Sequence, residues 1–159
     1  MKNIILTSCS FLICFSCSRV DLISANAESI IAEVKLAKGS QAVLLNIWAT
    51  SCPPCVAEFP MIVNLGKNNS ELNVLFVSTD FIDQINQVNQ FLHQYGVVGK
   101  SFIKNQKDQS FINGLHTEWT GALPFTIVFA KNSGEVVDYW EGSQHQTRFN
   151  SAIERAIKL

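Results

Sequence analysis

Runs of consecutive apolar residues mark the clearest elements of the chain. Residues 43–48 are apolar at every position except Asn46, and residues 74–77 and 125–129 are nearly as uniform. Such runs are typical of strands that are covered on both faces. A fourth run, residues 136–140, follows a turn that ends in a glycine, so we expect it to pair with 125–129 as an antiparallel hairpin.

Helical periodicity fills the stretches beside these runs. Apolar residues recur at helical spacing over residues 27–37, 84–95 and 149–157. Residues 53–65 follow the first strand directly and also favour a helix, which should bend at Pro60. Strand, helix and strand in this order imply parallel pairing of the first two strands. The pattern therefore predicts an α/β fold, in which a central mixed sheet is flanked by helices on both faces.

Residues 99–121 are the least regular part of the chain. The apolar pair in Ser101-Phe102-Ile103 predicts a short strand, and residues 108–115 predict a short helix. Both elements are short, so periodicity defines them less sharply than the rest.

Length and composition fit one ordinary domain. The chain has 159 residues, of which 47% are apolar and 16% charged, and this balance is globular rather than disordered. The formal net charge is -1 and no basic run is present. Nothing in the charge pattern favours nucleic acid as a partner.

The first seventeen residues have the pattern of an export leader. Met1-Lys2 gives a basic start, and the apolar stretch that ends at Phe15 is shorter than the ~20 residues of a membrane-spanning helix. Cys17 resembles the lipidated cysteine of a bacterial lipoprotein. Ala25-Asn26-Ala27 has the small-x-small form of an ordinary cleavage site.

We therefore divide the chain into a signal peptide or leader, residues 1–25, with lipidation at Cys17, and one domain, residues 26–159. The alternatives are cleavage at the alanine motif, which releases a soluble protein, and an uncleaved membrane anchor. All three place the domain outside the cytoplasm, in the periplasm or cell envelope.

Cys52 and Cys55 carry the chemistry that the sequence predicts. The other three of the five cysteines lie in the leader, so the body has too few for a disulfide-stapled scaffold. Cys52 comes between a strand and a helix, where free backbone amides and the helix dipole favour a thiolate. Cys55 follows one turn later and can close a disulfide with it. Pro53 and Pro54 suit the first helical turn, which needs no amide donors.

The stretch from Trp48 to Pro60, with its Cys-Pro-Pro-Cys motif, and Leu123-Pro124 before a late strand resemble thioredoxin-fold thiol-disulfide oxidoreductases. Within them the chain is most similar to the TlpA/ResA type, and the order of elements matches over residues 27–159. The resemblance implies a thioredoxin-like domain. Ser51 stands where this group usually has tryptophan, which puts the substrate preference in doubt but leaves the chemistry intact.

The resemblance also implies roles for residues around the cysteines. Asn46 replaces the buried aspartate of thioredoxin and cannot handle a proton, whereas Glu58 matches the glutamate with which the TlpA/ResA group does so. The alternative for Glu58 is an exposed helix residue. Pro124 matches the cis-proline facing the dithiol, with Leu123 presenting backbone groups to the substrate; the alternative is a trans proline at a strand start.

The remaining aromatic and imidazole side chains have structural interpretations. We expect Trp48 in the core, and Trp119 either in the substrate groove or in packing. The three histidines are isolated in the sequence and favour surface or loop positions. Half of a structural zinc site is the alternative for the cysteine pair, but no second Cys-x-x-Cys exists to complete it.

The sequence thus predicts an exported protein-disulfide reductase that works through Cys52 and Cys55 and needs no cofactor beyond this redox-active disulfide. The expected partners are protein disulfide substrates and, by resemblance, a membrane thiol-disulfide electron donor, with cytochrome c maturation as a frequent family role. We expect a monomer. A disulfide oxidase or isomerase, and a copper-binding module that uses the two thiolates, are the alternatives.

Overall fold

The structure is a computed structural model that describes residues 20–159. The predicted leader and its lipidation site, Cys17, lie outside these residues. Among the helices of residues 20–159, none combines the length and apolar character that crossing a membrane requires. The elements are β1 (Val20–Ala25), α1 (Ala27–Leu36), β2 (Ala42–Trp48), α2 (Pro53–Lys67), β3 (Leu72–Ser78), the short η1 (Ile82–Gln84), α3 (Ile85–Gln94), β4 (Gly99–Lys104), α4 (Asp108–Leu115), β5 (Phe125–Phe129), β6 (Val136–Glu141) and α5 (Gln146–Lys158).

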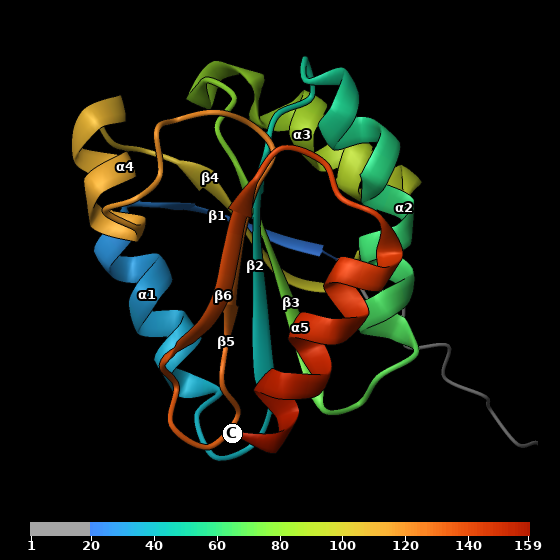
Figure 1. The fold of residues 1–159 in the computed structure, drawn as a ribbon. Helices are drawn as coiled ribbons and strands as arrows, with labels where there is room; N and C mark the ends of the chain where they lie inside the picture. The colour runs from blue at the N-terminus through green and yellow to red at the C-terminus, as the bar shows by residue number, and fades with distance from the viewer. Residues whose placement is uncertain (1–19) are drawn as a thin grey trace, which may run out of the picture.

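One mixed six-stranded sheet forms the middle of the domain (Figure 1), with strand order β1-β4-β3-β2-β5-β6. β2 pairs in parallel with β3, and β4 pairs in parallel with both β3 and β1. β5 runs antiparallel to β2 and β6 antiparallel to β5. The predicted parallel pairing and the final hairpin are therefore both confirmed.

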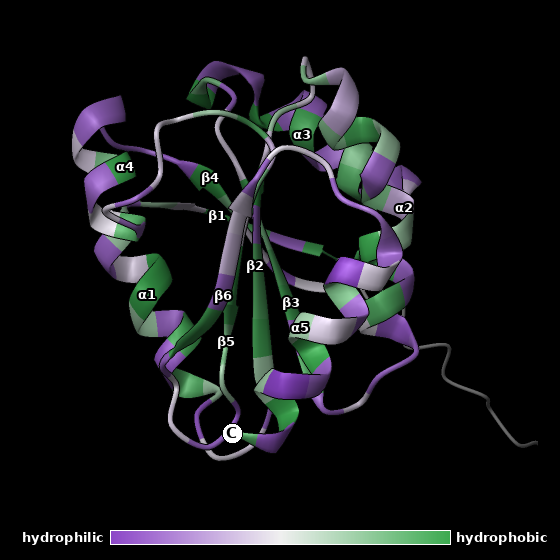
Figure 2. Cartoon of the chain, in the orientation of Figure 1, coloured by the Kyte–Doolittle hydropathy of each residue, from purple (hydrophilic) through white to green (hydrophobic). Residues whose placement is uncertain are grey.

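The helices cover both faces of the sheet. α1 and α4 pack on one face, and α2, α3 and α5 pack on the other (Figure 1). Every residue of β2 is buried, and its side chains alternate between the two cores. Val43, Leu45 and Ile47 face α1 and α4, whereas Leu44 and Trp48 face α2. Figure 2 accordingly shows β2 as largely hydrophobic.

The predicted elements agree closely with the observed ones. Asn26 caps α1, since its side chain accepts a hydrogen bond from the amide of Ser29 at 2.8 Å. The helix at 108–115 is observed with those bounds, and the strand expected at 101–103 is the centre of β4. α2 continues through Pro60 to Lys67.

The start of the domain differs from the prediction. Residues 20–25, which we placed in the leader, form β1, and its six residues pair with β4 from Val20 opposite Gly99 to Ala25 opposite Lys104. β1 is an edge strand and mostly half-exposed, so its sequence has no long apolar run from which a strand could be predicted. The folded domain therefore includes residues 20–25.

An aromatic cluster ties α2 to the sheet and to α3. Phe59 is 0% exposed, and its ring centroid lies 4.2 Å from that of Phe76, 4.8 Å from that of Trp48 and 5.0 Å from that of Phe91. These partners come from β3, β2 and α3. Phe59 is therefore a main side chain of those that hold the helix with both cysteines in place.

The cluster predicts a large loss of stability for Phe59→Ala. Truncating a buried phenylalanine removes its packing and leaves a cavity, so the free energy of unfolding should fall by about 3–5 kcal/mol in urea denaturation. Phe81→Ala is the matched control, because Phe81 is 76% exposed. Its loss should be within ~0.5 kcal/mol. Equal losses for the two variants would contradict the assigned role of Phe59.

Candidate active site

Cys52 is the N-cap of α2. Its backbone is extended, and its sulfur accepts a hydrogen bond from the amide of Cys55 at 3.3 Å. Pro53 and Pro54 occupy the first helical positions, and the first turn contains no acidic residue. The sulfur therefore sits where the Cys55 amide and the positive end of the helix dipole stabilise an anion. The arrangement that the sequence predicted for Cys52 is present.

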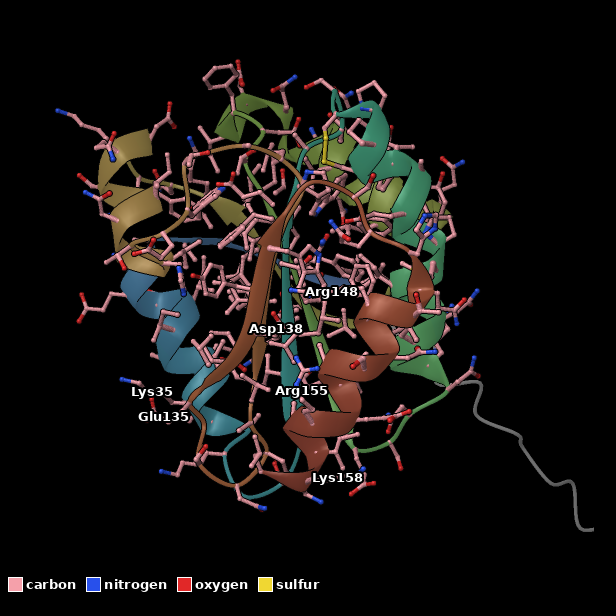
Figure 3. All side chains as sticks on the ribbon, viewed as in Figure 1. Lys35, Glu135, Asp138, Arg148, Arg155 and Lys158 are labelled. Atoms are coloured by element: carbon pink, nitrogen blue, oxygen red, sulfur yellow. A yellow bond between two sulfur atoms is a disulfide. The ribbon has the colours of Figure 1, made fainter. Side chains whose placement is uncertain are left out.

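Cys52 and Cys55 are joined in a disulfide, with their Cα atoms 5.3 Å apart. The disulfide is the yellow bond at the start of α2 in Figure 3. The two cysteines differ in access, since Cys52 is half-buried and Cys55 is only 1% exposed. Only the first sulfur is open to an incoming protein substrate, whereas the second can be reached chiefly from Cys52.

Glu58 lies one helical turn beyond Cys55 and is 6% exposed, so the alternative of an exposed helix residue is wrong. Glu58 Oε1 accepts a hydrogen bond from Asn46 Nδ2, and Glu58 Oε2 accepts one from the amide of Gln144, each at 3.3 Å. Burial raises the pKa of Glu58 to about 7, because it penalises the charged carboxylate more than these two hydrogen bonds favour it. The group is thus poised to exchange a proton near neutral pH.

Asn46 joins three elements beneath this site. It is fully buried on β2, and besides Glu58 it donates to Thr126 Oγ1 at 3.1 Å, across the register pair of β2 and β5. Asn46 faces α2 because it lies between Leu44 and Trp48, which share that face. The side chain can donate to Glu58 but has no proton to titrate.

The Leu123-Pro124 peptide bond is cis, so the alternative of a trans proline is wrong. Pro124 directly precedes β5, whose first residue, Phe125, pairs with Ile47 near the end of β2. This places the proline at the same end of the sheet as the cysteines. Leu123 is partly buried against both cores. Their contact with substrate stays a prediction.

The aromatic and imidazole residues take mainly structural positions. Trp48 is fully buried. Trp119 is buried too: its ring stacks on Phe125 at 5.0 Å, and its Nε1 donates to the carbonyl of Ala122 at 2.9 Å. His116 packs on Tyr139, whereas the other two histidines, His93 and His145, are exposed. Ser51 is exposed beside Cys52 and offers no apolar surface.

No three His, Cys, Asp or Glu side chains within residues 20–159 are arranged to hold a metal ion. The copper alternative rests on the two thiolates of the reduced pair, which are soft ligands.

Two contacts of the site were not found from the sequence. One is the amide of Gln144, which reaches Glu58 from the loop before α5. The other is Asp80, which follows β3 and accepts hydrogen bonds from Thr50. A polar triplet directly after a buried strand, Ser78-Thr79-Asp80, was a usable signal for the second. A backbone amide has no sequence signal at all.

Comparison with known proteins agrees with this geometry. The Redoxin family profile matches residues 20–156. The thiol-disulfide oxidoreductase ResA of Bacillus anthracis is 30% identical over 123 residues, which is 77% of this chain and 67% of the relative. Both matches cover the cysteine pair and most of the domain.

Solved structures show the same fold. A thiol:disulfide interchange protein from Chlorobium tepidum has a TM-score of 0.63 at 20% identity, covering 79% of this chain and 83% of the other. The exposed lipoprotein thioredoxin of Streptococcus pneumoniae has a TM-score of 0.59 at 17% identity, covering 77% and 89%. With the predicted thioredoxin fold thus confirmed, the chain belongs to the Redoxin family, as a thiol-disulfide oxidoreductase of the TlpA/ResA-like type.

Proposed function

We propose that this oxidoreductase works as a protein-disulfide reductase outside the cytoplasm. The observation that carries the proposal is the pairing of a half-exposed Cys52 at a helix N-terminus with a buried Cys55 beside Glu58. In the reduced protein, the Cys52 thiolate attacks a substrate disulfide, forms a mixed disulfide and releases one substrate thiolate. Cys55 then attacks Cys52, which releases the second thiolate and leaves the Cys52-Cys55 disulfide.

Glu58 supplies the proton acceptor for the second step. Cys55 must lose its proton to attack, and its buried position disfavours a free thiolate. Glu58 is one turn away on the same helix face and is deprotonated above a pKa of about 7. Its carboxylate accepts the Cys55 proton, and Asn46 and the Gln144 amide hold the carboxylate in place.

Each cycle moves two electrons to the substrate and oxidises the dithiol, so a donor must restore it. A membrane thiol-disulfide carrier fits this need, since exchange with another dithiol requires no bound cofactor. Protein disulfides are the substrates that the family implies, with apocytochrome c cysteines as one candidate. The half-exposed sulfur of Cys52 suits an extended polypeptide laid across the Leu123-Pro124 loop.

The fold supports processing of the leader before Val20. Cleavage at Ala25-Asn26-Ala27 would remove β1 and the cap of α1, and it would turn β4 into an unprotected edge. Ala25 and Ala27 are both buried. Lipidation at Cys17 keeps β1, and the structurally similar thioredoxin of Streptococcus pneumoniae is itself an exposed lipoprotein. We expect intact mass of the envelope-purified protein to show a mature chain that retains Val20; a chain that begins after Ala27 would contradict this.

Cys55→Ala should trap substrates. Without the second thiol, the Cys52 adduct cannot be displaced from within the protein, so mixed disulfides should accumulate and appear on non-reducing gels as species that reductant dissolves. Cys52→Ala is the matched control and should trap none, because the exposed nucleophile is gone. The identity of the trapped proteins reports substrate and donor together.

The reductase direction has its own test. Equilibration of the wild-type protein with glutathione gives its reduction potential, and we expect a value near the reducing end of the range known for this fold, about -270 mV. A strongly oxidising value, near -120 mV, would contradict the reductase proposal and favour an oxidase.

In the trapping experiment, equal trapping by Cys55→Ala and Cys52→Ala would contradict thiol-disulfide exchange through this cysteine pair.

Glu58→Gln should remove a pH dependence centred near 7. In the wild type, the rate at which Cys55 resolves a mixed disulfide should rise through the Glu58 pKa of about 7 as the carboxylate forms. In the variant this rise should be absent, and the rate at pH 8 should fall on the order of 10²-fold. Stopped-flow release of a chromogenic thiol from the mixed disulfide measures it. Glu154→Gln, at an exposed position of α5, should leave the profile unchanged.

The same pKa shift gives an independent readout in the oxidised protein. The pKa of Glu58 is 4.5 in the unfolded chain and about 7 in the folded one. Between these two pH values the folded state keeps Glu58 protonated, whereas the unfolded state does not. Stability from this group is therefore full below pH 4.5 and is lost as the pH rises to 7, by about 3 kcal/mol. Glu58→Gln should abolish this slope in denaturation at pH 5 and pH 8. A slope that persists would show that Glu58 is not the group responsible.

A further inference from the structure

Asp80 is a buried carboxylate that the exchange chemistry does not use. It lies two residues after the end of β3 and is 6% exposed. Ser78 is the last residue of β3, and β3 lies beside β2 in the sheet. Asp80 is thus placed next to the segment that leads from β2 to Cys52.

Both oxygens of Asp80 are held by that segment. The Thr50 amide donates to Oδ2 at 2.9 Å and to Oδ1 at 3.2 Å, and the Thr50 hydroxyl donates to Oδ1 at 2.7 Å. The Ser78 hydroxyl donates to Oδ2 at 2.6 Å and in turn accepts from the Asp80 amide at 3.0 Å. Hydrogen bonds of hydroxyls and amides to a carboxylate are among the stronger ones in proteins.

Thr50 belongs to the turn that connects the end of β2 to Cys52 at the start of α2. The amide of Cys52 donates to the carbonyl of Ala49 at 3.2 Å, so Thr50 occupies the first central position of this turn. Just before this turn, the carbonyl of Trp48, the last residue of β2, accepts a hydrogen bond from the amide of Thr79 at 2.8 Å. The turn is therefore tied to the end of β3 through its backbone and through the Thr50 side chain.

We propose that Asp80 is a positioning residue for the redox pair, acting through Thr50 to keep Cys52 within reach of Cys55. A fixed turn raises the effective concentration of one thiol toward the other and so favours the intramolecular disulfide. The proposal rests on thiol-disulfide exchange by Cys52 and Cys55, and it is independent of the direction in which the protein works.

The equilibrium with glutathione measures this effective concentration. One protein dithiol and one oxidised glutathione give the protein disulfide and two reduced glutathione molecules, so two electrons and two thiol protons pass to glutathione. Asp80→Ala leaves the Thr50 amide and hydroxyl without their acceptor and frees the turn. We expect the equilibrium constant for disulfide formation to fall about tenfold, which corresponds to about 30 mV toward a more oxidising potential.

Two further variants test whether the change in the equilibrium constant comes from the lost hydrogen bonds of Asp80, from its negative charge or from its side-chain shape. Asp83→Asn removes an exposed acid from the neighbouring η1 and should leave the constant within twofold of the wild type. Asp80→Asn keeps the side-chain volume and one acceptor oxygen, so its effect should lie between the wild type and Asp80→Ala. A shift as large in Asp83→Asn as in Asp80→Ala would overturn the proposal, because the cause would then be charge.

Substitutions at Thr50 test the contact between Thr50 and Asp80 with a smaller change of structure. Thr50→Val removes the hydroxyl bond and keeps the shape, so the constant should fall several-fold, whereas Thr50→Ser keeps the hydroxyl and should restore it. In the double variant Thr50→Val with Asp80→Ala the losses should be less than additive, because both substitutions remove the bond from the Thr50 hydroxyl to Asp80. An unchanged constant in Thr50→Val and Asp80→Ala, with only a lower free energy of unfolding, would show that Asp80 is merely structural.

These outcomes are distinguishable from failure of the reductase proposal. A wild-type protein that reduces no protein disulfide still reaches equilibrium with glutathione, so the effect of Asp80 on the constant can be read in either case. Conversely, a wild-type constant in every Asp80 variant overturns the positioning role and leaves the reductase proposal intact.

Discussion

The burial of β2 on both faces is the constraint on which the rest of the structure depends. A strand in the middle of a sheet must place alternate side chains into two separate cores, and β2 does so along its whole length. Its even-numbered residues face α2, the helix that follows it. The cysteine pair therefore begins at a rigid strand end, where the chain has little freedom in the direction it takes next.

The same alternation creates the polar centre beneath the cysteines. Asn46 is an even-numbered residue of β2 and must face α2, while Glu58 lies on the stripe of α2 that packs inward with Cys55 and Phe59. Asn46 and Glu58, together with Thr126 on β5, are thus forced together in a mainly apolar layer. Desolvation there exceeds the hydrogen bonds that the carboxylate receives, so the pKa of Glu58 rises to about 7 rather than falling.

Four loops meet at the end of the sheet where β2 terminates. The turn before Cys52, the segment after β3 with Asp80, the cis Leu123-Pro124 and the loop with Gln144 all contact this region or each other. They come from widely separated parts of the chain and are aligned only because β2, β3 and β5 are neighbours. A redox site whose two cysteines are three residues apart therefore depends on the topology of the whole sheet.

The resemblance to the TlpA/ResA group implied the cis-proline and the role of Glu58, and the sequence by itself determined the cysteine pair and the elements with long apolar runs or clear helical periodicity. These signals are local, because alternation, spacing and helix position can be read within a few residues. Only the tertiary structure decided that residues 20–25 form β1, that Glu58 is buried against Asn46 and Gln144, and that Asp80 holds Thr50. Each of these depends on contacts between distant segments, whose partners are fixed by strand order and register and leave no periodic trace in the chain.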